Sequence, residues 1–139
     1  MAVHDISDPN TGHLLARHVT AEEWSKGGLQ FFSDDSHYMQ VGMWGYDAGK
    51  RLLAHTHNIV PRAVERTHET LYVRKGSVEA RIFNEARELM ATLVVAEGDL
   101  LTLMWGGHGY TIIEDGTQVL EIKNGPYVGA EQDRVRFES

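Results

Sequence analysis

Cysteine is absent from this chain of 139 residues, so the chain can form no disulfide bond, offer no thiolate to a metal and use no cysteine nucleophile. Any metal site must therefore consist of nitrogen and oxygen ligands. Long apolar runs are absent too, and no stretch approaches the roughly 20 apolar residues of a membrane span. The opening residues, MAVHDISDPNTG, lack the basic and apolar segments of a secretory signal, so we expect a cytoplasmic protein with no membrane partner.

Basic residues are in the minority: 13 Lys and Arg stand against 20 Asp and Glu, which gives a net charge of -7 at pH 7. Binding to a nucleic-acid backbone draws on a dense basic surface, and the sequence contains no such cluster. We therefore expect no nucleic-acid partner. Hydrophobic residues make up 42% of the chain and charged residues 24%, as in ordinary globular proteins, and the length suits a single domain over residues 1–139.

What the sequence does contain is a series of short segments rich in apolar, β-branched and aromatic residues, separated by turn residues. Such segments predict an all-β protein, either a sandwich or a barrel. Lys75 and Gly76 predict a hairpin turn between the strands on either side of them. The expected strands are Tyr38–Tyr46, Arg51–His57, Glu69–Val73, Val78–Phe83, Leu89–Val95, Leu100–Met104, Gly109–Ile113 and Gln118–Lys123.

The two ends of the chain carry weaker patterns. Residues 1–37 predict an irregular N-terminal arm with one short strand, a helical turn after a Thr20 cap, and a further strand at Leu29–Phe32. Residues 124–139 are rich in turn residues and then charged. They predict a C-terminal tail that packs across the rest of the domain or across a neighbouring subunit.

A pair of histidines stands near the middle of the chain, in the stretch from residue 49 to residue 76. Successive side chains of a strand point to opposite faces, so His55 and His57 would share a face with Leu53. Two imidazoles would then project together, as a pair of metal ligands requires.

An acidic residue follows the pair at the start of the next expected strand. Glu69 would share a face with apolar Leu71, whereas its neighbour His68 would share a face with polar Thr70. His68 competes with Glu69 for the inner position, and the alternation favours Glu69. A carboxylate that is buried without a partner is costly, which also favours a metal or another partner for Glu69.

Two blocks of sequence resemble the motifs of the cupin superfamily. The first consists of Gly49, His55, His57, Glu69 and Gly76, with a longer gap before the glutamate, and the second is GDLLTLMWGGHG, which contains His108. The resemblance covers roughly residues 38–123. It implies a cupin-like double-stranded β-helix, the small jelly-roll barrel, between the N-terminal arm of residues 1–37 and the C-terminal tail of residues 124–139.

The resemblance also implies a set of metal ligands, namely His55, His57, Glu69 and His108. If the two blocks meet in the barrel, three imidazoles and one carboxylate suit a divalent transition metal such as Zn, Fe, Ni, Co or Mn. The same set does not favour Ca or Mg, which prefer oxygen ligands. The alternative is that these histidines are surface residues or hydrogen-bonded core residues.

Four further residues are candidates for contact with a substrate. Arg62, in the loop that interrupts the first block, offers a planar fork to a carboxylate or phosphate, and Arg66 in the same loop offers another. The alternative is that both arginines pair with carboxylates of the solvated loop. Trp105 and Tyr110 flank His108 and would line a pocket or stack on a sugar ring, unless they belong to the core.

As a cupin, the chain is expected to act on a small molecule through its metal, and the family includes dioxygenases, isomerases and epimerases. A tail similar to KNGPY is associated with sugar metabolism, which suggests a sugar or carboxylate ligand. The alternatives are a non-catalytic binding or sensor protein and a metal with a purely structural role. No catalytic residue is assigned, although Lys123 and Tyr127 are either acid-base groups or surface residues. Cupins commonly dimerise through sheet edges, so we expect a homodimer.

Overall fold

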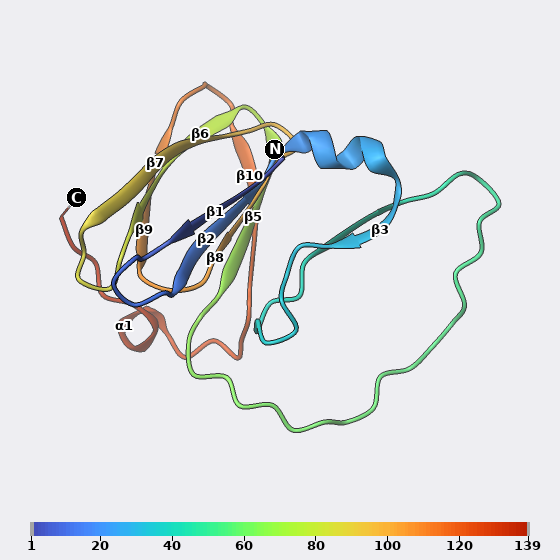
Figure 1. Ribbon diagram of the computed structural model, residues 1–139, viewed down its shortest axis with the longest axis horizontal. Helices are drawn as coiled ribbons and strands as arrows, with labels where there is room; N and C mark the ends of the chain where they lie inside the picture. The colour runs from blue at the N-terminus through green and yellow to red at the C-terminus, as the bar shows by residue number, and fades with distance from the viewer. Residues whose placement is uncertain (1, 139) are drawn as a thin grey trace.

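The computed structural model describes residues 2–138 and is built mainly from antiparallel β-strands, as the sequence predicts (Figure 1). The strands β1, β2, β8, β5 and β10 form a five-stranded sheet in this order, β7, β6 and β9 form a three-stranded sheet, and β3 pairs with β4. The elements in chain order are β1 (Val3–Ser7), β2 (Leu14–Val19), the 3-10 helix η1 (Ala21–Lys26), β3 (Gly28–Phe31), β4 (Gly42–Gly45), β5 (Glu69–Lys75), β6 (Ser77–Phe83), β7 (Leu89–Ala96), β8 (Leu100–Leu103), β9 (Gly107–Ile112), β10 (Gln118–Lys123) and α1 (Ala130–Asp133).

The apolar core lies between the two larger sheets. One sheet contributes β2, β5 and β8, and the other contributes β6 and β7. The predicted alternation is correct in β6, where Val78, Ala80 and Ile82 are all buried. Every second side chain of a strand faces the same way, so each sheet presents one apolar face to the other. The buried members of this core are Leu15, Ala16, Leu71, Val73, Ala80, Ile82, Val95, Leu101 and Leu103.

The predicted hairpin around Lys75 and Gly76 is wrong, because β5 and β6 do not pair. β5 pairs with β8 and β10, whereas β6 pairs with β7 and β9. The chain therefore passes from one sheet to the other at Gly76, which has a φ of +81° and lies against Thr117. A glycine suits this position because a Cβ would collide with Thr117. The alternation showed which face of each strand is buried, but not which strand is its partner.

The predicted strand Arg51–His57 is also wrong. Residues 46–68 contain no strand and form a long loop that projects from the body of the molecule, drawn from blue-green to green in Figure 1. Leu53 is 82% exposed, and Ile59 is fully exposed. A strand needs a neighbour for its backbone N–H and C=O groups, and no strand of residues 2–138 pairs with this segment. The neighbouring expected strand, Tyr38–Tyr46, is reduced to β4, which pairs with β3.

The N-terminal residues are more regular than the expected arm with one short strand. β1 and β2 pair with each other, and β2 lies beside β8 in the five-stranded sheet, where Leu15 and Ala16 enter the core. The helical turn after Thr20 is present as η1, but the Thr20 side chain makes no capping hydrogen bond. The strand expected at Leu29–Phe32 is present as β3.

The C-terminal tail packs across one end of the two sheets, beside α1 in Figure 1. Phe137 makes an edge-to-face contact with Phe83, with 5.2 Å between the ring centroids. Thr67 donates a hydrogen bond to the carboxylate of Asp133. The tail thus packs across its own domain, which is one of the two arrangements expected from the sequence.

Gly106, between β8 and β9, gives a test of how tightly this end of the fold is packed. Its φ is +77°, and a Cβ there would collide with the carbonyl oxygen of Phe83. We expect Gly106→Ala to lower the free energy of unfolding by more than about 2 kcal/mol in chemical denaturation. Gly12→Ala is the matched control, because Gly12 has a φ of +76° but a Cβ at that position would meet no atom within 4 Å. We expect this variant to lower the free energy of unfolding by only about 1 kcal/mol. Equal losses in the two variants would contradict this packing.

Candidate functional site

A cavity of about 1060 Å³ opens between the ends of the two sheets and the C-terminal tail. β5 and β9 contribute to its wall from the two sheets, and residues 64–67 and 124–126 contribute from adjoining loops. A cavity of this size is large enough for a small-molecule ligand. The charged and aromatic side chains on its wall include Arg66, Glu69, Trp105, His108, Tyr110 and Lys123.

Glu69 is the centre of a hydrogen-bonded cluster on this wall. It is the first residue of β5 and is 9% exposed. Oε1 of Glu69 lies 3.1 Å from Nε2 of His108 and accepts a hydrogen bond of 3.1 Å from the hydroxyl of Tyr110. His108 and Tyr110 are two residues apart on β9 and therefore share a face of that strand. The cluster thus joins the five-stranded sheet to the three-stranded sheet.

The cluster keeps the Glu69 carboxylate ionised in spite of its burial. Burial by itself raises the pKa of Glu69. The hydrogen bond and positive charge of His108, the hydrogen bond from Tyr110 and the charge of Lys123 act the other way and lower the pKa below its ordinary value. The Glu69 carboxylate is therefore ionised at neutral pH.

Tyr110 is held in its protonated form. Burial raises the pKa of its phenol, and the negative charge of Glu69 and the hydrogen bond to it raise the pKa further. The hydroxyl is consequently a hydrogen-bond donor over the whole physiological pH range.

His68 and Glu69 are both buried, which alternation alone did not predict. His68 is 2% exposed and points away from Glu69, towards the loop at residues 33–40, where its ring lies 4.6 Å from the ring of Tyr38. Burial lowers the pKa of His68 to about 4, and the positive charge of Arg66 and the nearby His37 act in the same direction. The polar face of β5 is therefore covered by another part of the chain rather than by solvent.

The other predicted ligands, His55 and His57, lie on the projecting loop. Their rings are 5.0 Å apart, so the two imidazoles are adjacent, as the spacing predicts. Both side chains are exposed, and neither lines the cavity. In residues 2–138, no group of three or more His, Asp or Glu side chains is arranged to hold a metal. The structure brings Glu69 and His108 together but does not bring the other two to them.

Some of the predicted substrate contacts lie on the cavity wall and others lie outside it. Trp105 and Tyr110 line the cavity. Arg62 lies on the exposed loop, outside the cavity, where its Nη1 donates to the carbonyl oxygen of Val60 at 3.4 Å. Arg66 is the arginine of that loop which reaches the cavity wall.

Asn124 is a structural member of the site that was not predicted from the sequence. It follows β10, and its Oδ1 accepts a hydrogen bond of 2.7 Å from the backbone N–H of His68. Its Nδ2 donates to the carbonyl oxygen of Arg66 at 3.2 Å. These bonds fix residues 66–68 at the entrance to β5. No local pattern could reveal a contact between segments so far apart in the chain.

Comparisons with models of known families, with curated proteins and with solved structures found no match to the chain. Neither of the short helices in residues 2–138 has the length and apolar character needed to cross a membrane.

The burial of His68 predicts a pH-dependent loss of stability. The folded protein has a His68 pKa of about 4, whereas an unfolded histidine has one near 6.5. Between these values the unfolded chain binds a proton that the folded protein does not. The free energy of unfolding should therefore fall from pH 6.5 towards pH 4, by up to about 1.4 kcal/mol per pH unit from this group.

Chemical denaturation between pH 7 and pH 4 checks this prediction. His68→Gln should flatten the pH dependence relative to the wild type, whereas His4→Gln, which removes an exposed histidine of β1, should leave the slope unchanged. The same slope in all three proteins would show that His68 is not buried in neutral form.

The opposing contributions to the pKa of Glu69 predict how this carboxyl group titrates in a second variant, His108→Ala. In His108→Ala, burial of the carboxylate remains while the largest opposing contribution is removed. The pKa of Glu69 should therefore rise, as followed by ¹³C NMR of the labelled carboxyl group. A titration identical to that of the wild type would show that His108 does not contact Glu69 in solution.

Proposed function

We propose that the chain is a metal-dependent member of the cupin superfamily that acts on a small molecule of sugar or carboxylate type in the cavity beside Glu69 and His108. The observation that carries the proposal is the approach of these two residues to 3.1 Å on the cavity wall. Glu69 belongs to the first cupin-like block and His108 to the second. The two antiparallel sheets around one core are compatible with a double-stranded β-helix.

The chemistry of the pair fits a divalent transition metal. An ionised carboxylate and an imidazole are both ligands for Zn, Fe, Ni, Co or Mn. The low pKa of Glu69 supports its anionic, metal-binding form. Oε1 of Glu69 and Nε2 of His108, which now contact each other, would instead contact the ion. A metal held there would supply Lewis-acid or redox chemistry.

The projecting loop offers the remaining ligands. β9 pairs only with β6 among the strands of residues 2–138, so its other edge is free. If residues 51–57 added to that edge as a strand, His55 and His57 would be carried to the sheet that holds His108. This rearrangement would also satisfy the backbone groups of the segment and cover its exposed apolar side chains.

The chain's own residues would then orient the ligand. Tyr110 keeps its proton and could donate a hydrogen bond to an oxygen of the ligand, and the Trp105 ring offers an apolar surface to a sugar. Lys123 adds a positive charge to the cavity wall. These groups suit an isomerase, an epimerase or a dioxygenase.

The second candidate is a non-catalytic metal-dependent binding or sensor protein. It is favoured by the use of Glu69 and His108 as ligands, because this removes the best-placed acid-base pair of the cavity from proton transfer. A binder would retain its ligand unchanged, whereas an enzyme would release a product.

A homodimer remains part of the proposal. Among the strands of residues 2–138, β10 pairs only with β5, and the exposed Leu120 and Ile122 on β10 form an apolar surface at this side of the five-stranded sheet. A second copy could cover this edge, as exposed strand edges generally require.

Metal analysis of protein purified without an affinity tag tests the proposed function. After incubation with Zn, Fe, Ni, Co or Mn and removal of free ion, we expect about one equivalent bound to the wild type for at least one ion. Glu69→Gln and His108→Ala should each weaken binding at least tenfold, because each removes a ligand. Loss in His55→Ala and His57→Ala as well would show that the loop closes onto the cavity.

His4→Ala is the matched control, because it removes an exposed histidine outside the cavity and should retain the metal. A wild type that holds no more of any ion than His108→Ala would contradict the metal site.

A further inference from the structure

Arg66 lies on the cavity wall, where residues from distant parts of the chain contact its guanidinium. Its guanidinium carbon lies 3.3 Å from the centroid of the Trp105 ring. The ring of His13 is also stacked on Trp105, at 3.9 Å between centroids and with an interplanar angle of 8°. Both groups cannot occupy one face of the indole, so Trp105 is sandwiched between His13 and Arg66. The contact holds the guanidinium against the indole ring.

His68 holds the same guanidinium from a second direction. Nη2 of Arg66 lies 3.3 Å from Nε2 of His68, which accepts the hydrogen bond when the imidazole is neutral. The imidazole is buried, and a histidine side chain carries no negative charge in either protonation state. The contact therefore positions Arg66 without neutralising its charge.

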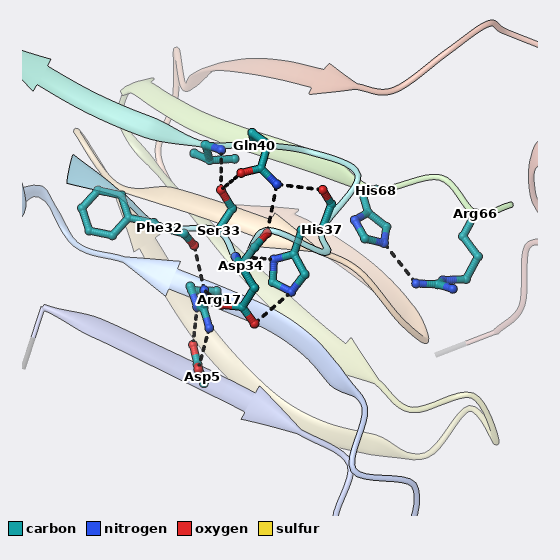
Figure 2. Close-up of polar contacts among 10 residues, drawn as sticks. Asp5, Arg17, Phe32, Ser33, Asp34, His37, Gln40, Arg66 and His68 are labelled. Carbon is teal, nitrogen blue, oxygen red and sulfur yellow. Dashed lines mark hydrogen bonds and ion pairs between the residues drawn. The ribbon is translucent and has the colours of Figure 1, made fainter. Parts of the chain in front are cut away.

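Figure 2 shows a network of polar contacts beside the pair formed by His68 and Arg66. Arg17 of β2 forms an ion pair with Asp5 of β1 at 2.7 Å and donates to the carbonyl oxygen of Phe32 at 2.8 Å. These bonds tie the loop at residues 33–40 to the five-stranded sheet. Within that loop Asp34 contacts His37, whose ring lies 6.3 Å from the ring of His68.

Among the described residues, the positive charge of Arg66 has no carboxylate partner. No ion pair of Arg66 with an Asp or Glu side chain is formed in residues 2–138, and its Nε is buried without a hydrogen-bond partner. In a chain with a net charge of -7, acidic side chains are not scarce. Glu69 is engaged by His108 and Tyr110, and Asp133 by Thr67. A fixed, charged and unpaired guanidinium on a cavity wall is suited to bind an oxyanion.

We propose that Arg66 is the anion-binding group of the cavity and that it receives the carboxylate or phosphate of the small-molecule ligand. Trp105 and His68 position it, and the rest of the ligand extends towards Glu69, His108 and Tyr110 on the same wall. The inference rests on the proposed function only in taking this cavity as the ligand site, and it does not require the metal. Of the two arginines that the sequence offered for this role, it selects Arg66 rather than Arg62.

Anion titration of metal-free protein in the presence of EDTA tests the assignment. The Nε–Hε NMR signals of the arginines are followed during titration with inorganic phosphate and, separately, with malonate, with sodium chloride at matched ionic strength as the reference. We expect the Arg66 signal to shift and saturate with at least one of the two anions. The anion with the lower dissociation constant identifies the ligand class as phosphate or carboxylate.

Substitutions of Arg66 and Arg62 test whether anion binding depends on Arg66. Arg66→Gln should weaken binding of that anion at least tenfold, and Arg66→Lys, which keeps the charge but loses the planar fork, should weaken it about threefold or more. Arg62→Gln is the matched control: it removes an arginine of the same loop that lies outside the cavity and should leave the dissociation constant unchanged. Amide spectra of each variant verify the fold.

Three results would overturn the proposal: a wild-type Arg66 signal that does not shift beyond the chloride reference, an unchanged dissociation constant in folded Arg66→Gln, or an equal loss in Arg62→Gln. Metal binding by Arg66→Gln is measured in parallel and should equal that of the wild type. Failure of anion binding with intact metal binding would contradict only the role of Arg66. Failure of metal binding with intact anion binding would contradict only the metal site.

Discussion

The contact of Glu69 with His108 and Tyr110 is the interaction on which the cavity end of the molecule depends. Glu69 begins a strand of the five-stranded sheet, and its two partners lie on a strand of the three-stranded sheet. The apolar core holds the sheets together along their length, whereas this polar contact joins them at the cavity. Its two partners offset the cost of burying the carboxylate, so a negative charge can persist on the cavity wall.

The sequence predicted the faces of the strands better than it predicted their partners. Alternation identified Val78, Ala80 and Ile82 as core residues because burial of one face is a local property of a strand. It could not show that the chain changes sheets at Gly76, since pairing depends on distant segments. It failed over residues 51–57 because an extended segment becomes a strand only where a neighbour accepts its hydrogen bonds.

The sequence likewise predicted some of the residues of the candidate site and missed others. The two sequence blocks pointed to Glu69 and His108, and these residues do meet. The pattern His-x-His predicted adjacent rings for His55 and His57, but local spacing carries no information on what the pair faces. Arg66 and Asn124 acquire their positions from contacts made across the fold, which no spacing rule contains. Together Glu69 and Arg66 place one carboxylate and one guanidinium on the wall of the same cavity.

Paramagnetic mapping of the site tests the central claim most directly, because it locates the bound ion rather than counting it. Substoichiometric Mn²⁺ broadens the amide signals of residues near the ion in a ¹⁵N-labelled sample of the full chain. We expect the strongest broadening at Glu69, His108 and Tyr110, with residues 55–57 affected as well if the loop closes onto β9. Broadening that is confined to other parts of the chain, with the signals of Glu69 and His108 remaining sharp, would contradict the account.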